Sequence, residues 1–75
     1  MDERNELMQA VKARAFAARV SLYAVATAAG VSGTVITRWI KGAYTPSLKT
    51  IGRFEKALQR IESEHAWEAI EGEKA

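Results

Sequence analysis

Helix-breaking residues are confined to a few positions in this 75-residue chain, and their placement limits the possible folds more than any other feature. The chain has five glycines and one proline, and the segments between them are rich in residues that favour helices. No segment alternates apolar and polar residues over the length of a strand. We therefore expect an all-α fold, a compact bundle of four or five helices.

Two serines mark the start of two short helices. Ser21 and Ser32 are predicted N-caps, because a serine hydroxyl can accept a hydrogen bond from a backbone N–H two or three residues later. They begin helices at about 22–29 and 33–41. Gly30 lies between them and tolerates the left-handed backbone that ends a helix. The pattern predicts two helices joined by a tight turn.

Longer amphipathic segments flank this pair. A first helix is expected from residue 2 or 3 to Ala18, with its apolar stripe at Leu7, Val11, Ala15 and Ala18. After Pro46, Ser47 caps a further helix, whose apolar positions are Leu48, Ile51, Phe54, Leu58 and Ile61. The aromatic residues Phe16, Trp39 and Phe54 are interpreted as core, because they lie on or near apolar helical faces.

Charge is divided unevenly along the chain. Residues 8–60 contain nine Lys or Arg and a single acid, Glu55, so this body carries a net charge of +8. Residues 61–75 contain five Glu and one Lys, a net charge of −4. A basic body is typical of proteins that bind polyanions, since neutralising phosphates releases counterions. Basic surfaces also serve membranes and acidic proteins, so charge alone does not decide the partner.

Several classes of protein are disfavoured. The chain has no cysteine, and no His/Asp/Glu cluster has ligand spacing, so we expect no disulfide, metal or cofactor, and we interpret His65 as a surface residue. Its apolar runs fall far short of the ~20 residues that span a bilayer, and its N-terminus is charged, so the expected location is the cytoplasm. No nucleophile–base pair, phosphate-cradling glycine loop or small-molecule pocket is evident, so we do not expect an enzyme.

The third predicted helix has two different faces. At about 100° per residue, Ile36, Trp39 and Ile40 fall on one side. The other side presents Thr34, Thr37, Arg38 and Lys41. This outward set offers hydrogen-bonding groups for base edges, a guanidinium that fits guanine and methyl groups that can meet thymine. Residues 7–54 contain no acidic side chain that would repel phosphate.

The segment 21–58 resembles the helix-turn-helix of the Cro and phage-repressor type, the XRE-like family. The agreeing residues are Ser21, Val25, Ala26, Gly30, Val31, Ser32, Ile36, Trp39, Gly42, Pro46, Ser47, Ala57 and Leu58. The resemblance implies a lambda-repressor-like bundle with the helix-turn-helix at about 22–41 and a recognition helix at about 33–41 in the major groove. It also implies that bases are read from Gly33, Thr34, Thr37 and Arg38. The positions that hold backbone phosphates are then Tyr23, Ser32, Lys41, Tyr44 and Thr45.

Three residues depart from the family pattern. Leu22 stands where a glutamine often contacts DNA, so that contact is lost or passes to Tyr23. Gly33 has no side chain at a usual reading position, and a helical glycine costs about 1 kcal/mol relative to alanine, less near a helix start. Ile40 replaces a residue that is often acidic, and we expect it to extend the core.

The resemblance implies a sequence-specific DNA-binding transcriptional regulator, a phage or prophage repressor or Cro-like protein. An alternative is a protein-binding helix-turn-helix module, such as an antitoxin or a phage-encoded inhibitor, with Val35, Ile40 and the tail at the contact. We divide the chain into a DNA-binding domain, 1–60, and an acidic tail, 61–75. Apolar residues in the tail require either a fold-back or a second chain, and a homodimer would use Ile61, Trp67 and Ile70.

Overall fold

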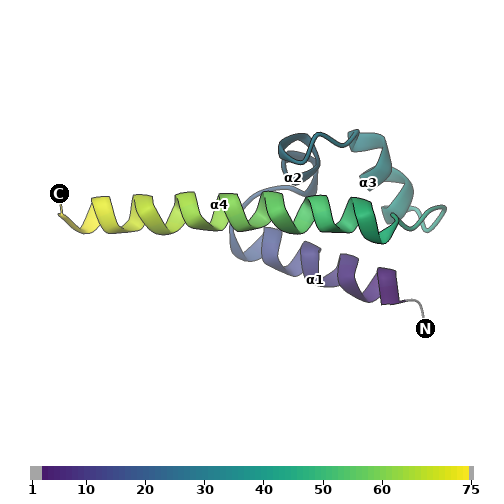
Figure 1. Ribbon diagram of the computed structural model, residues 1–75, viewed down its shortest axis with the longest axis horizontal. Coiled ribbons are helices and arrows are strands. Elements are labelled where there is room, and N and C mark those ends of the chain that lie inside the picture. The colour runs from purple at the N-terminus through teal and green to yellow at the C-terminus, as the bar shows by residue number, and fades with distance from the viewer. Residues whose placement is uncertain (1–2, 75) are drawn as a thin grey trace.

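The computed structural model describes residues 3–74, with side chains described for residues 3–64. Four helices and no strand are found over this range. They are α1 (Glu3–Ala17), α2 (Leu22–Ala28), α3 (Gly33–Ile40) and α4 (Leu48–Lys74). Figure 1 shows α4 running the length of the molecule, with α1 along one side and α2 and α3 on the other. The all-α helical bundle is confirmed.

The predicted caps form as expected. The Ser21 hydroxyl accepts a hydrogen bond from the Ala24 N–H at 3.0 Å, and the Ser32 hydroxyl accepts one from the Thr34 N–H at 3.2 Å. Ser47 caps α4 in the same way, through the Thr50 N–H at 3.3 Å. These bonds satisfy N–H groups that have no partner inside the helix, so the helix starts are fixed locally by the sequence.

The turn between α2 and α3 is closed by Gly30. Its φ of +73° is left-handed, a conformation that a side chain would strain. The Val31 N–H then bonds back to the Ala26 carbonyl at 2.8 Å. Ala26 is fully buried, and its small side chain lets α2 and α3 approach each other closely. The turn therefore sets the angle at which α3 leaves α2.

The core lies where α1, α2, α3 and the first half of α4 meet. Its fully or almost fully buried side chains are Met8, Val11, Ala15, Val25, Ala26, Ile36, Trp39, Ile51, Phe54, Ala57 and Leu58. Trp39 and Phe54 are core residues, as predicted. On α1, Met8 is buried while Leu7 is only partly buried, so the stripe is rotated slightly from the predicted one.

Three predicted core residues are exposed instead. Phe16 has 84% of its surface exposed, Ile40 61% and Leu48 56%. Phe16 follows the buried Ala15 and Ile40 follows the buried Trp39, and one residue turns a helix by about 100°, which carries each side chain out of its buried stripe. Leu48 is the first residue of α4, where the helix has only begun to pack.

Two side-chain contacts tie α1 to later helices. The Arg14 guanidinium donates hydrogen bonds to both oxygens of Glu62 on α4, from Nη2 to Oε1 at 2.6 Å and from Nε to Oε2 at 3.2 Å. The Trp39 indole N–H on α3 donates to Asn5 Oδ1 at 3.0 Å. These contacts hold α1 against both α3 and the middle of α4.

The boundary drawn at residues 60 and 61 falls inside α4, which continues unbroken to Lys74. Figure 1 shows its C-terminal part projecting past the other three helices rather than turning back onto them. The side chains of His65, Trp67 and Ile70 lie outside the described side chains. Among the described residues, no helix is long and apolar enough to cross a membrane.

Candidate nucleic-acid interface

α3 has one side in the core and one side in solvent. Ile36 and Trp39 are buried, whereas Thr34 and Arg38 are exposed on the other side. Lys41 is the exposed C-cap residue, and its N–H bonds to the Thr37 carbonyl at 3.1 Å. A helix that is fixed by one face can present the other to a partner. This is the arrangement required for a helix that enters a DNA groove.

Asn5 is a positioning residue that the sequence reasoning missed. Its bond to the Trp39 indole satisfies the only polar atom of a side chain that is otherwise packed in the core. Because Trp39 lies on α3, the contact fixes the orientation of the helix from α1. No local pattern links residues 34 positions apart, so only the fold reveals this pair.

Tyr23 and Thr37, predicted to contact phosphate and base respectively, are bonded to each other. Their hydroxyl oxygens are 3.0 Å apart, and the Thr37 hydroxyl also lies 3.4 Å from the Gly33 carbonyl. With Thr37 donating to that carbonyl, the Tyr23 hydroxyl donates to Thr37. Thr37 is half-buried, and its hydroxyl hydrogen is engaged within the protein. Its methyl group and a remaining lone pair are what it can offer to a base.

The absence of a side chain at Gly33 has a structural cause. A Cβ at this position would lie 3.1 Å from Cδ1 of the Tyr23 ring, closer than ordinary van der Waals contact. The ring therefore lies against the first residue of α3, in space that a side chain at position 33 would occupy. Tyr23 is 46% exposed, so its outer edge remains accessible beside the start of α3.

The loop from α3 to α4 carries the last predicted contacts, Tyr44 and Thr45. Gly42 has a left-handed φ of +76°, and the Ala43 N–H bonds back to the Arg38 carbonyl at 3.0 Å, which turns the chain sharply. Pro46 is fully buried and anchors the end of the loop. Tyr44 is left exposed and Thr45 half-buried, close in sequence to the C-terminal end of α3.

The positive charges of Arg38 and Lys41 are not neutralised by described acidic side chains of the same chain. Among the described side chains, Arg38 and Lys41 make no ion pair. The ion pair between Arg14 and Glu62 is on α1 and α4, where the hydrogen bonds from Arg14 lower the pKa of the Glu62 carboxyl and the same bonds raise the pKa of Arg14. Both Arg38 and Lys41 are thus available to an anionic partner.

The described side chains contain no group of three or more His, Cys, Asp or Glu residues that could hold a metal ion. What the site does assemble is a set of hydroxyl, guanidinium and ammonium groups around one exposed helix. Such groups recognise phosphates and base edges by hydrogen bonds and charge.

Comparison with known proteins gives one match. The family model described as Helix-turn-helix matches residues 12–64, which includes α2, α3 and the loop that follows. No curated protein and no solved structure matches the chain significantly.

Proposed function

The chain belongs to the helix-turn-helix family of the XRE, Cro and lambda-repressor-like type, and we propose on that premise that it is a sequence-specific transcriptional regulator. In this proposal α3 lies in the major groove of an operator. The protein acts as a small repressor or Cro-like regulator of a phage or prophage, in the cytoplasm of a bacterial or phage-infected cell. Its work is binding, without a chemical step.

The observation that carries the proposal is the outward face of α3. The exposed Arg38 guanidinium can donate two hydrogen bonds to a guanine, and Thr34 can contact a neighbouring base. At position 33 the Tyr23 ring fills the space that a side chain would occupy, so the backbone is what Gly33 can offer to DNA, and Thr37 offers its methyl group. Three different groups on one exposed face are enough to distinguish base pairs.

Phosphate contacts are assigned to the residues around this face. Ser32 and Tyr23 lie at the start of α3, and Lys41, Tyr44 and Thr45 lie at its end and in the following loop. Contacts at both ends of a recognition helix would fix its register on the duplex without reading sequence. Their contribution is expected to weaken steeply as salt is raised.

We also propose that the protein binds as a homodimer through its tail, with Ile61, Trp67 and Ile70 contributing apolar surface. Ile61 is partly buried on α4, and the helix beyond it projects away from its own body. A two-fold dimer would read two half-sites about 34 Å apart, one turn of B-DNA, so the operator should be palindromic.

Selection of bound sequences from a random DNA pool tests the proposal. The full-length chain should enrich a palindromic motif with half-sites about one helical turn apart. Failure to enrich any motif at low salt would contradict sequence-specific binding. Sequences should be recovered at two salt concentrations, so that sequence preference is separated from general attraction to phosphate.

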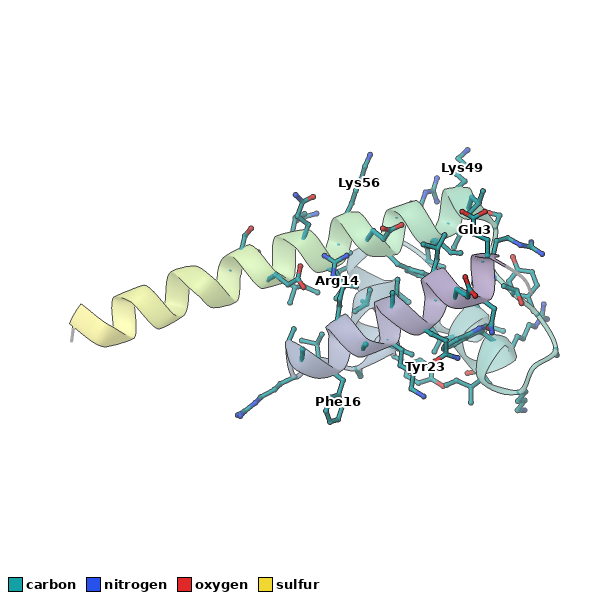
Figure 2. All side chains as sticks on the ribbon, turned by 90° about the horizontal axis from the view of Figure 1, so that it is seen from below. Glu3, Arg14, Phe16, Tyr23, Lys49 and Lys56 are labelled. Carbon is teal, nitrogen blue, oxygen red and sulfur yellow. The ribbon has the colours of Figure 1, made fainter. Side chains whose placement is uncertain are left out.

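A second function, binding to another protein, is favoured by a different observation. An open groove of about 580 Å³ lies between α1 and α2, bordered by the exposed Phe16, Ile40 and Tyr23. Figure 2 shows Phe16 pointing away from the body. Exposed apolar side chains beside an apolar groove are typical of protein-binding surfaces, such as those of antitoxins or phage-encoded inhibitors.

The double variant Phe16→Ser/Ile40→Ser separates the two functions. Both side chains are largely exposed, so the protein should remain folded. If the groove serves only a protein partner, operator affinity measured on purified protein will stay unchanged while regulation in cells is lost. Unchanged regulation in cells would exclude the groove as a functional surface.

A further inference from the structure

The open groove between α1 and α2 continues along α1 into a second, smaller hollow. The groove has a volume of about 580 Å³ and the hollow one of about 160 Å³. Gln9 and Lys12 of α1 and Ile40 of α3 line both of them, so the two adjoin and form one depression. We call this depression the α1 groove. It runs beside α1, from the start of α2 to the last residue of α3.

The α1 groove has the length and the openness of a site for a helix. Its residues on α1 include Asn5, Gln9, Lys12 and Phe16, which are separated by four, three and four positions and therefore share one face of that helix. At about 1.5 Å per residue they span roughly 16 Å, three turns of an α-helix. Sites for small molecules enclose most of their ligand, whereas this depression is open. A helix lying along α1 would cover its whole length.

Most of the lining is apolar, so the face of the occupant that enters the groove must be apolar too. Phe16 and Ile40 have most of their surface exposed, and Ala13, Val20 and Leu22 complete the apolar lining with them. Exposed apolar side chains gathered in this way mark a surface that another protein covers. A helix that binds in such a groove uses anchors at positions i, i+3 or i+4, and i+7.

Charge adds a second requirement for the occupant. Lys12 lies on the lining face of α1, is exposed, and makes no ion pair among the described side chains. Arg19 directly precedes Val20 of the lining, Lys41 directly follows Ile40, and both cations are exposed. Among the described residues, no acidic side chain lines the groove. The complementary helix therefore carries Asp or Glu along its edges.

The groove also reaches the residues that hold and surround α3. Tyr23 lines it, and the same side chain lies 3.0 Å from the Thr37 hydroxyl and against Gly33. Ile40 is the last residue of α3. Tyr23 and Lys41 are also the residues assigned to phosphates in the proposed complex with DNA. A helix in the groove would cover the exposed edge of Tyr23 and bring acidic groups close to Lys41, where phosphates are expected.

We propose that the α1 groove binds an acidic amphipathic helix of a partner protein, and that this helix and the operator exclude each other. The inference rests on both proposed functions, regulation at an operator and binding to a protein, and it joins them. The apolar face of the partner covers Phe16 and Ile40, and its acidic edge pairs with Lys12. The bound helix occupies the Tyr23 side of α3, so the partner releases the protein from DNA.

Other occupants fit this surface less well. A small apolar molecule would leave most of the length of the groove uncovered. DNA phosphates could pair with Lys12, but they would bring no apolar group to Phe16 and Ile40. Two copies of the groove packed on each other would bring cations together with no acidic side chain of the lining between them. An acidic amphipathic helix satisfies the shape, the apolar surface and the charge together.

A displayed library of helical peptides of about 18 residues, or five turns, tests the groove with the full-length chain as bait. Positions i, i+4, i+7 and i+11 are varied among Leu, Ile, Phe and Trp, and the others among Glu, Lys, Gln and Ala. The selected peptides should contain more Glu than Lys. In fluorescence anisotropy, Phe16→Ser/Ile40→Ser should raise the Kd of the best peptide at least about tenfold, because two apolar contacts are lost. Lys12→Glu should raise it at least about threefold, because an attraction becomes a repulsion.

Leu48→Ser and Lys56→Glu are the matched controls, since they make the same kinds of change at exposed positions outside the groove. Figure 2 shows Lys56 projecting on the side of the molecule opposite Phe16 and Tyr23. Both controls should bind the peptide with the wild-type Kd. Circular dichroism checks that every variant stays helical.

Competition is then measured with labelled operator. Peptide at about ten times its Kd should raise the apparent operator Kd about tenfold, as mass action requires when the two ligands exclude each other. The same peptide concentration should have much less effect on operator binding by Phe16→Ser/Ile40→Ser. Peptide binding that leaves the operator Kd unchanged would overturn the exclusion.

The remaining outcomes decide the partner. Failure to enrich any peptide, a selected set without an excess of Glu, or equal binding to Phe16→Ser/Ile40→Ser would overturn the assignment of the groove to an acidic helix. A wild-type dimer that dissociates in the same variant, measured by sedimentation equilibrium, would give the groove to a second copy of the chain instead. A chain that binds no operator would overturn the regulator and the exclusion, while peptide binding, measured without DNA, still decides what the groove binds.

Discussion

Removing the hydroxyl of Tyr23 tests the side-chain hydrogen bond that joins α2 to α3. Tyr23→Phe keeps the ring against Gly33 and deletes only the bond to Thr37, 3.0 Å long. Thr37 retains the Gly33 carbonyl as a partner, so no buried group is left unsatisfied. The loss should therefore be the net value of one hydrogen bond, about 0.5–1.5 kcal/mol, and the partial exposure of Tyr23 places it in the lower half of that range.

Thermal unfolding followed by circular dichroism measures this loss. For a domain of this size, about 0.5–1 kcal/mol corresponds to a fall in Tm of roughly 2–8 °C. Thr37→Val should cost a similar amount while keeping a branched side chain. The double variant should lose little more than either single one, with a coupling free energy of about 0.5 kcal/mol or more. Strictly additive effects would refute the reasoning, because they would mean that the two hydroxyls do not interact in solution.

Three further predictions concern DNA affinity, core packing and acid stability. Arg38→Ala should cost about 1–3 kcal/mol on the selected operator and relax its sequence preference, whereas Lys41→Ala should weaken all sequences similarly and reduce the salt slope by about one; electrophoretic titrations at several salt concentrations distinguish the two. Ile36→Ala, which removes a fully buried side chain, should lower the free energy of unfolding by about 2–5 kcal/mol in urea titrations. The Arg14–Glu62 bonds lower the pKa of Glu62 in the folded state, so their contribution is present above the unfolded-state pKa and is lost as pH falls through the folded-state pKa. Arg14→Gln should abolish that part of the acid dependence of Tm, and a wild-type acid profile in the variant would show that the pair does not matter.

Local signals in the sequence were sufficient to locate the helices. Ser21, Ser32 and Ser47 cap the helices that they were predicted to cap, and Gly30 closes the turn with the left-handed backbone that its chemistry allows. These features depend on neighbours within a few residues. They are readable without knowledge of the tertiary fold.

Whether Phe16 and Ile40 are buried depends on how wide the buried face of each helix is. The periodicity of apolar residues does not determine that width. The pattern identified the correct side of α1 but included Phe16 in the core, and it extended the core face of α3 to Ile40. In both cases a single step along the helix separates a buried residue from an exposed one. Whether a neighbouring element reaches that far is decided by the tertiary arrangement.

In the candidate site, too, some features follow from the local sequence and others depend on the tertiary fold. The exposure of Thr34 and Arg38 follows from the two-sided pattern of α3. The bonds from Tyr23 to Thr37 and from Trp39 to Asn5 join residues far apart in the chain, so no spacing rule predicts them. They are contacts that position the helix, and they appear only once the fold is known.

The specificity ratio of the wild-type chain tests the central claim most directly. Binding to the selected operator and to a scrambled duplex of equal length should be measured at one fixed, physiological salt concentration. If the exposed face of α3 reads bases, the operator should be bound at least about 1,000-fold more tightly than the scrambled duplex. Equal affinity for the two duplexes would contradict sequence-specific recognition by this helix.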